Sequence, residues 1–170
     1  MCGIAGYIGE KQFSENAINN TLEIMKNRGP DQQEWRSFSS NGIHVYLLHS
    51  RLAILDLDKR SNQPFSFNGA SLIFNGEIYN YIEIRDELKK LGYKFNTDSD
   101  TEVLLKAYHE YGEDCVNKFN GMWAFAIWDK KKHKLFLSRD RFAEKPLYYY
   151  KTNEGFYFGS EIKAIRSLVS

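Results

Sequence analysis

The chain has 170 residues, of which 42% are hydrophobic and 26% are charged, and this composition excludes wholesale disorder. Its formal net charge is +1, so no electrostatic signal favours nucleic acid or an anionic membrane as a partner. The length predicts one domain over residues 1–170, and the 15% of aromatic residues favours packed sheets over a helical bundle.

The first residues and the cysteines bear on where the protein works. No apolar run reaches the roughly 18 residues that span a bilayer, and the N-terminus lacks the basic start and apolar stretch of a secretory signal. The two cysteines, Cys2 and Cys115, do not form a disulfide framework. We therefore expect a reducing, cytoplasmic location. The unusual feature is that Cys2 directly follows the initiator methionine.

The N-terminal part of the chain predicts two strands and one helix. Residues 3–8 form a short apolar strand, and Ser14 is the expected cap of a helix that stops at Gly29-Pro30. The apolar positions of that helix are Ile18, Leu22 and Met25. Residues 43–49 predict a second strand, and residues 51–57 continue as another apolar stretch.

Short strands and two helices follow. Residues 70–74 predict a strand that ends at the turn dipeptide Asn75-Gly76. The next helix ends at Gly92, and its apolar positions are Tyr81, Ile84, Leu88 and Leu91. A further helix begins at Ser99 or Asp100 and ends at Gly112.

The last third of the chain predicts mainly strands. Residues 122–128 are apolar on both faces, which indicates a strand covered on both sides. A hairpin returns over residues 135–137, two short strands follow at 147–150 and 156–158, and a helix starts at Glu161. The pattern favours an α+β fold in which two mostly antiparallel sheets pack together with helices outside. Periodicity alone leaves an α+β fold with a single sheet open.

Cys2 is the first candidate for chemistry. Removal of the methionine would give this residue both a thiol and the free α-amine of the chain. An α-amine titrates near about 7.7–8.0, so it can act as a general base beside its own thiol. The alternative is that Cys2 is only a small residue at a frayed terminus.

Attack by a thiolate on an acyl group requires hydrogen-bond donors for the developing oxyanion. Asn75 and Gly76 offer a side-chain amide and an unobstructed backbone N–H at the end of a strand. The alternative is an ordinary Asn-Gly hairpin turn. The charged Glu77 directly after the pair weakens that alternative.

Two charged residues could hold an amino acid by its backbone groups. Arg51 lies in an apolar run and needs a partner, for which a carboxylate is the natural choice. Asp100 could bind an ammonium group, although a helix N-cap is the competing interpretation. We interpret His44, His109 and His133 as lacking metal-ligand spacing, and Cys115 as a small core residue.

With these residues assembled, the chain closely resembles the N-terminal glutaminase domain of glutamine-dependent asparagine synthetases. That family belongs to the class II glutamine amidotransferases, a branch of the N-terminal nucleophile hydrolases. The motifs that carry the resemblance run in family order over nearly the whole chain: Cys2-Gly3-Ile4-Ala5-Gly6, Arg28-Gly29-Pro30-Asp31, His49-Ser50-Arg51-Leu52-Ala53-Ile54, Gln63-Pro64, Asn75-Gly76-Glu77-Ile78-Tyr79-Asn80, Ser99-Asp100-Thr101-Glu102, Gly121-Met122-Trp123-Ala124-Phe125-Ala126, Arg139-Asp140-Arg141 and Lys145-Pro146-Leu147-Tyr148-Tyr149.

The resemblance implies a four-layer αββα sandwich and hydrolysis of L-glutamine by Cys2 once Met1 has been removed. It implies that Asn75 and Gly76 form the oxyanion hole and that Arg51 binds the glutamine carboxylate. It further assigns Asp100 and Glu77 to the glutamine amino group, and it places Leu52, Ile54 and Leu55 along the same pocket.

The resemblance also bears on cofactors and partners. We expect no cofactor or metal in this domain, because ATP and Mg²⁺ belong to the synthetase domain of the family. That domain is absent from the sequence, so the expected partners are L-glutamine and a synthetase domain in cis or as a separate subunit. The full-length family also makes a homodimer of the whole enzyme possible, with neither nucleic acid nor a membrane as a partner.

The sequence departs from the family at one loop position, where Ala143 stands in place of the usual glycine. A positive φ at this position would strain an alanine. Two alternatives stay open from the sequence: a glutaminase domain that serves another acceptor than aspartate, and a non-catalytic regulatory domain. The complete set of Cys2, Asn75, Gly76, Arg51 and Asp100 argues against the second alternative.

Overall fold

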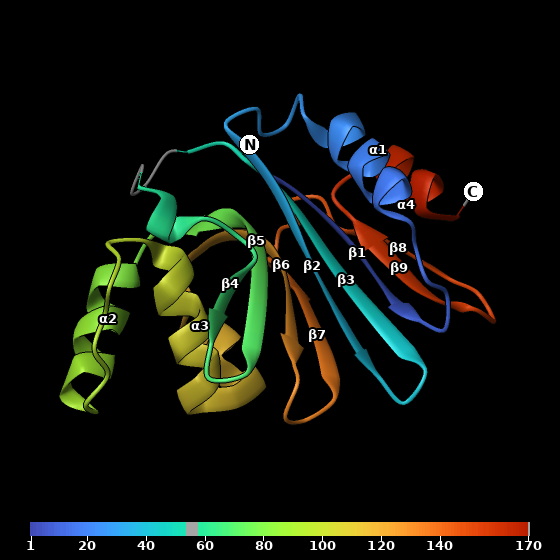
Figure 1. Ribbon diagram of the computed structural model, residues 1–170. Helices are drawn as coiled ribbons and strands as arrows, with labels where there is room; N and C mark the ends of the chain where they lie inside the picture. Colours follow the sequence, from blue (N-terminus) through green and yellow to red (C-terminus); the bar gives the residue numbers. More distant parts are fainter. Residues whose placement is uncertain (54–57, 170) are drawn as a thin grey trace.

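Two antiparallel sheets form the centre of the molecule in a computed structural model that describes residues 1–53 and 58–169 (Figure 1). The first sheet has the strand order β2-β3-β1-β9-β8. Its strands are β1 (Gly3–Gly9), β2 (Gln32–Ser40), β3 (Ile43–Arg51), β8 (Tyr148–Lys151) and β9 (Gly155–Gly159). The chain therefore starts in a central strand of this sheet, with a partner on each side.

The second sheet has the order β4-β5-β6-β7. Its strands are β4 (Phe65–Phe67), β5 (Ala70–Ile78), β6 (Gly121–Asp129) and β7 (Lys134–Arg139). β6 alternates between two apolar interiors, as predicted. Phe125 and Ile127 pack with one cluster of buried residues, whereas Ala124 and Ala126 pack with another.

Helices cover the outer face of each sheet (Figure 1). They are α1 (Glu15–Met25), α2 (Tyr81–Lys90), α3 (Asp100–Tyr111) and α4 (Ile162–Val169), with the short 3-10 helices η1 (Lys59–Ser61) and η2 (Gly112–Lys118). α1 and α4 pack on the first sheet, and α2 and α3 pack on the second. Cys115 is fully buried in η2, as expected of a core residue.

Three clusters of buried apolar residues lie between the layers and hold them together. One lies between α1, α4 and the first sheet, and includes Met25 and Leu168. The second lies between the two sheets and includes Leu47 and Ile73. The third lies under α2 and α3 and includes Leu104. The predicted four-layer αββα sandwich is therefore confirmed, and the single-sheet alternative is wrong.

The expected turn at Asn75-Gly76 is wrong, because β5 continues through both residues to Ile78. Asn75 pairs with Ala124 and Gly76 pairs with Trp123 on β6. Glycine is required here for a different reason: a Cβ at Gly76 would collide with the carbonyl oxygen of Met122. Long-range pairing with β6 therefore overrides the local preference of Asn-Gly for a turn.

Further details differ from the sequence prediction or complete it. β2 and β4 lie where the sequence predicted no strand. Leu91, which the sequence predicted as an apolar position of the helix, lies directly after α2 and is 53% exposed. Gly92 adopts φ +94°, in agreement with its predicted place at the helix end. The structure describes no helix within residues 1–53 and 58–169 that is long and apolar enough to cross a bilayer.

Candidate active site

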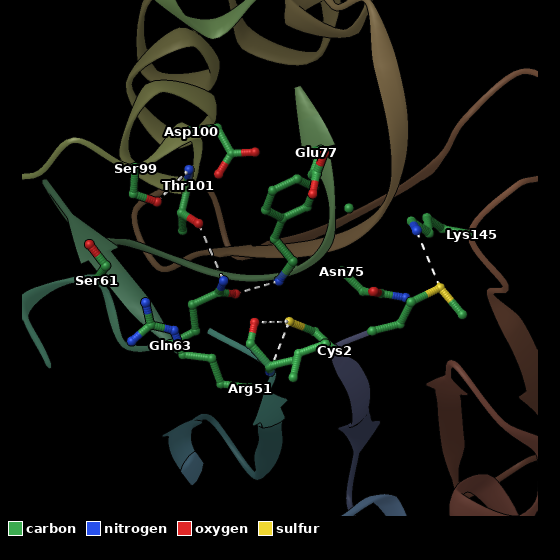
Figure 2. Close-up of a pocket in the computed structure, with 14 residues that line it drawn as sticks. Cys2, Arg51, Ser61, Gln63, Asn75, Glu77, Ser99, Asp100, Thr101 and Lys145 are labelled. Atoms are coloured by element: carbon green, nitrogen blue, oxygen red, sulfur yellow. Dashed lines mark hydrogen bonds between the residues drawn. The ribbon is translucent and has the colours of Figure 1, made fainter. Parts of the chain in front are cut away.

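Cys2 directly precedes β1, and contacts of its neighbours fix its position. Gly3 pairs with Ser50 of β3, and the Arg28 Nε donates a hydrogen bond of 3.0 Å to the Cys2 carbonyl oxygen. The Cys2 thiol forms two hydrogen bonds with the backbone of Leu52. The Leu52 N–H donates to Sγ at 3.4 Å, and Sγ donates to the Leu52 carbonyl oxygen at 3.6 Å (Figure 2).

The surroundings of Cys2 keep its thiol protonated. Burial raises the pKa of the Cys2 thiol, and this outweighs the lowering by the Leu52 N–H, the positive chain terminus and Arg51. A thiol with a raised pKa carries little thiolate at neutral pH, so it requires a base before it can act as a nucleophile.

A pocket at the edge of the two sheets brings the predicted residues together (Figure 2). The first sheet and the segment after it contribute Cys2, Arg51 and Leu52, and β5 contributes Asn75, Gly76 and Glu77. Asp100 enters from the start of α3. Each described residue of the predicted site therefore lines one pocket. Ile54 and Leu55 lie outside the described residues.

Asn75 offers a hydrogen-bond donor that the described protein does not use. Its side chain is 1% exposed, and its amide nitrogen Nδ2 has no partner among the described residues. Buried donors without a partner are rare because desolvation is costly, and they frequently mark functional positions. Asn75 lies near Cys2 in the same pocket (Figure 2).

Arg51 ends β3 and is 6% exposed. Its Nη1 donates to the side-chain oxygen of Asn62 at 2.6 Å and to the Asp58 carbonyl oxygen at 3.3 Å. These contacts hold a guanidinium at the wall of the pocket, where it can bind a carboxylate through two parallel hydrogen bonds.

The helix-cap interpretation of Asp100 is wrong, because Ser99 caps α3. The Ser99 hydroxyl oxygen accepts a hydrogen bond from the Thr101 N–H at 3.0 Å. Asp100 is 4% exposed and accepts from the Ile78 N–H at 3.0 Å. Burial raises the pKa of Asp100 to about 6, and the nearby negative charge of Glu77 adds to this shift. Two carboxylates thus lie opposite Cys2 and can bind an ammonium group.

Sequence reasoning missed two residues that hold the backbone before Asn75. Gln63 accepts from the Phe74 N–H at 2.6 Å and donates to the Thr101 hydroxyl oxygen at 3.3 Å. His49 is fully buried, with its Nε2 at 3.2 Å from the Phe74 carbonyl oxygen. Burial lowers the pKa of His49 to about 3, so the ring is neutral and its Nε2–H donates to that oxygen. Both residues occur in the motifs quoted above, but only long-range contacts reveal their role.

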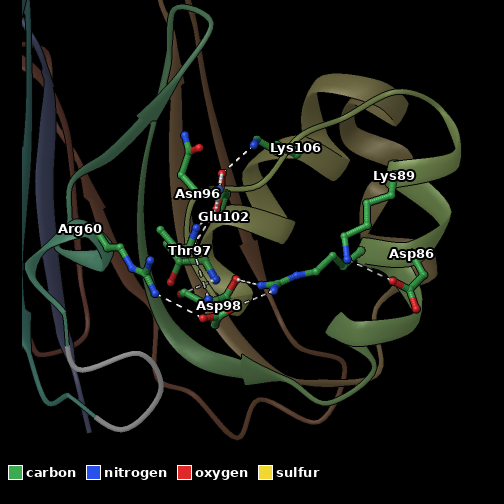
Figure 3. Close-up of polar contacts among 11 residues, drawn as sticks. Arg60, Asp86, Lys89, Asn96, Thr97, Asp98, Glu102 and Lys106 are labelled. Carbon is green, nitrogen blue, oxygen red and sulfur yellow. Dashed lines mark hydrogen bonds and ion pairs between the residues drawn. The ribbon is translucent and has the colours of Figure 1, made fainter.

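Ion pairs fix the segment that leads into α3 (Figure 3). Asp98 accepts from Arg60 at 3.2 Å and from Arg85 at 3.3 Å, which links η1 to α2. The Glu102 carboxylate accepts from the backbone N–H groups of Asn96 and Thr97 and pairs with Lys106 at 2.6 Å. These contacts hold the start of α3, and with it Asp100, against the pocket.

Comparison with known proteins extends these observations. The family described as "Glutamine amidotransferase domain" matches residues 1–170. A Bacillus subtilis protein named asparagine synthetase [glutamine-hydrolyzing] 1 is 42% identical over 172 residues, which cover 97% of this chain and 26% of that protein. A Gibberella zeae protein named amidase chry2 is 34% identical over 178 residues, which cover 96% of this chain and 26% of that protein.

A solved structure shows the same fold. The glutamine phosphoribosylpyrophosphate amidotransferase from B. subtilis, complexed with ADP and GMP, superposes with a TM-score of 0.81 over 99% of this chain and 44% of that chain. Its sequence identity is 18%, so this likeness concerns the fold alone. The chain spans about a quarter of the length of the two sequence relatives. The chain belongs to the glutamine amidotransferase domain family, and its sequence relatives include glutamine-hydrolysing asparagine synthetases.

Proposed function

We propose that this domain hydrolyses L-glutamine to glutamate and ammonia, with Cys2 as the nucleophile. The observation that carries the proposal is the pocket in which the Cys2 thiol, the unpartnered Asn75 amide, the Arg51 guanidinium and the Asp100 carboxylate meet. These groups match, one for one, a nucleophile, an oxyanion donor and the two ends of an amino acid. A complete set of this kind supports catalysis over a regulatory role.

The proposed reaction begins with binding. Removal of Met1 frees the α-amine of Cys2, Arg51 binds the α-carboxylate of glutamine, and Asp100 with Glu77 binds its α-ammonium. These anchors place the side-chain amide at Cys2, so that attack becomes effectively intramolecular. Leu52, Ile54 and Leu55 are proposed to line the same pocket.

Acyl transfer follows in two steps. The thiol passes its proton to the α-amine, and sulfur attacks the amide carbon while Asn75 and Gly76 stabilise the oxyanion. The carbon–nitrogen bond breaks, and the α-ammonium returns the proton, so ammonia leaves and a γ-glutamyl thioester remains. Water then attacks the thioester, which releases glutamate and restores the thiol. None of these steps needs a cofactor or a metal.

The fate of the ammonia depends on the longer protein. We propose that it serves the ATP- and Mg²⁺-dependent conversion of aspartate to asparagine by a synthetase domain, either fused to this domain or supplied as a subunit. The relative named asparagine synthetase supports this assignment. The relative named as an amidase supports a second candidate, in which the same domain delivers ammonia to another acceptor.

Substitution of Cys2 tests the nucleophile. We expect Cys2→Ala to abolish release of glutamate from glutamine, because no other group in the pocket can form the thioester. Cys115→Ala is the matched control, since the other cysteine is buried in η2 away from the pocket, and it should retain activity. Mass spectrometry should show that the active protein begins at Cys2. Glutaminase activity in Cys2→Ala, or full activity with Met1 retained, would contradict the proposal.

A further inference from the structure

Lys145 is a pocket residue to which the proposed reaction gives no role. It lies in the segment between β7 and β8 and is 7% exposed. Hydrogen bonds hold both its backbone N–H group and its carbonyl group. The Lys145 N–H donates to the Asp140 carboxylate at 2.9 Å, and the Arg139 Nε donates to the Lys145 carbonyl oxygen at 2.7 Å. The side chain is therefore directed into the pocket from a fixed point.

The ammonium group of Lys145 has a poor partner. Its Nζ lies 3.3 Å from the Met1 sulfur atom (Figure 2). None of the ion pairs among the described residues includes Lys145. A thioether is a weak acceptor, whereas a buried ammonium is costly without a good one. The partner that Lys145 has is also the residue whose removal the proposed function requires.

Loss of Met1 changes what lies in front of this ammonium. The Lys145 ammonium contacts the side chain of Met1, and Met1 is joined directly to the nitrogen of Cys2. The α-amine that forms on removal of Met1 therefore belongs to the residue next to the one that Lys145 contacts. A neutral amine carries a lone pair and accepts a hydrogen bond from an ammonium, whereas a protonated amine is repelled by it.

We propose, on the basis of the proposed function, that Lys145 is a positioning residue that takes the α-amine of Cys2 as its acceptor after Met1 has left and holds that amine in its neutral form. The neutral amine is the base that accepts the thiol proton. Lys145 thereby increases the fraction of enzyme that is ready for attack at neutral pH.

Other charges face the chain terminus from each side of the pocket. They are Arg28 after α1, Arg51 at the end of β3, Glu77 on β5 and Asp100 on α3, together with the Cys2 thiol itself. Glu77 and Asp100 favour a protonated amine in the empty pocket, and bound glutamine neutralises them with its own ammonium group. The effect of Lys145 should therefore be clearest in the glutamine-bound enzyme, where Glu77 and Asp100 no longer favour the protonated amine.

The test is the pH profile of glutamine hydrolysis by enzyme that begins at Cys2, compared with a Lys145→Met variant. We expect the acidic limb of kcat in the variant to move to higher pH by about one unit, as for removal of one adjacent like charge. Activity at pH 7 should fall up to about tenfold and recover at higher pH. Lys145→Arg should keep the original limb, and the exposed Lys130→Met should change nothing.

Superimposable profiles of Lys145→Met and the unaltered enzyme, or an equal loss at every pH, would overturn the proposal. The α-amine itself gives a second measurement that needs no variant. In complex with glutamate, whose ammonium group neutralises Glu77 and Asp100, enzyme labelled with ¹⁵N at cysteine should show a Cys2 amine that titrates below the ordinary range of about 7.7–8.0. An amine in or above that range would also overturn the role of Lys145. The proposed function stands or falls separately, through the activity of Cys2→Ala.

Discussion

At the scale of single residues, Asn75 should act on the transition state alone. Its buried amide nitrogen has no partner in the described protein, and an oxyanion forms only after attack. We expect Asn75→Ala to lower kcat for glutamine hydrolysis by about a hundredfold with little change in KM, as is typical when an oxyanion donor is lost. Steady-state kinetics of glutamate release checks this, and a rise in KM at constant kcat would assign Asn75 to ground-state binding.

Asp100 should make glutamine binding depend on pH. Its pKa is raised to about 6 by burial, so below that pH the group is protonated and uncharged. Only the carboxylate attracts the α-ammonium of glutamine, so affinity should rise as pH increases through 6 and then level off. Measured as KM against pH, this dependence should vanish in Asp100→Asn, whose KM should be high at every pH. An unaltered profile in that variant would remove Asp100 from the binding site.

Ala143 should store strain that a glycine would relieve. Its φ of +58° lies in the left-handed region, which confirms that the family's usual glycine has a conformational reason. We expect Ala143→Gly to increase the free energy of unfolding by about 1 kcal/mol, or to raise Tm by roughly 2–4 °C. Asn41→Gly is the control, because Asn41 has a similar φ of +52° and asparagine tolerates it. An equal gain in both variants would contradict strain at Ala143.

The sequence pointed more clearly to the pocket residues with distinctive chemistry than to the residues that support them. Cys2, Arg51 and Asp100 stand out because their chemistry is unusual for their position in the chain. His49 and Gln63 give no such signal, since a histidine in a strand and a glutamine before a proline are both ordinary. Their role depends on contacts with Phe74, which is 25 residues from His49 and 11 from Gln63 along the chain.

At the scale of elements, the start of α3 depends on a buried ion pair. Glu102 and Lys106 are almost fully buried, and Glu102 also accepts from the backbone before the helix. We expect Glu102→Ala to lower the free energy of unfolding by about 3–5 kcal/mol, because it leaves the Lys106 charge buried and unpaired. The exposed pair Glu23–Lys26 is the matched control, and Glu23→Ala should cost less than about 1 kcal/mol. Denaturant unfolding measures both, and equal losses would contradict the dependence on burial.

Strand β2 shows why some elements were missed. Its nine residues are mostly polar and none is fully buried, because it lies at the edge of the first sheet. An edge strand with one solvent face carries little apolar signal, whereas β6, buried on both faces, was predicted closely. β4 has three residues, which is too short for a periodicity to show.

At the scale of the whole molecule, the site depends on how the two sheets pack. Cys2 directly precedes β1 of one sheet, and Asn75 and Glu77 lie on β5 of the other. The interior between the sheets therefore sets the distance between the proposed nucleophile and the proposed oxyanion donor. The order of predicted elements favoured two packed sheets, the resemblance implied four layers, and both predictions are correct. Their relative position at the pocket edge was not predictable, since it results from side-chain packing in three dimensions.

Two core substitutions should separate stability from activity. Ile73→Ala opens a cavity between the sheets, and Leu168→Ala opens one under α4. Each should lower the free energy of unfolding by about 2–5 kcal/mol. We expect only Ile73→Ala to lower kcat at a temperature where both variants are folded, because only that cavity lies between the two halves of the site. Equal kcat values in the two variants would show that sheet packing does not control the reaction.

The place of β1 also has a consequence for the time at which the enzyme becomes active. β1 lies between β3 and β9, and β9 spans Gly155–Gly159 close to the end of the domain. A growing polypeptide therefore completes the sheet around its first residues only after almost the entire domain has left the ribosome. Asn75 likewise obtains its partner Ala124 late in synthesis. The proposed nucleophile is therefore made first, whereas one of the two strands that flank it is made among the last residues of the domain.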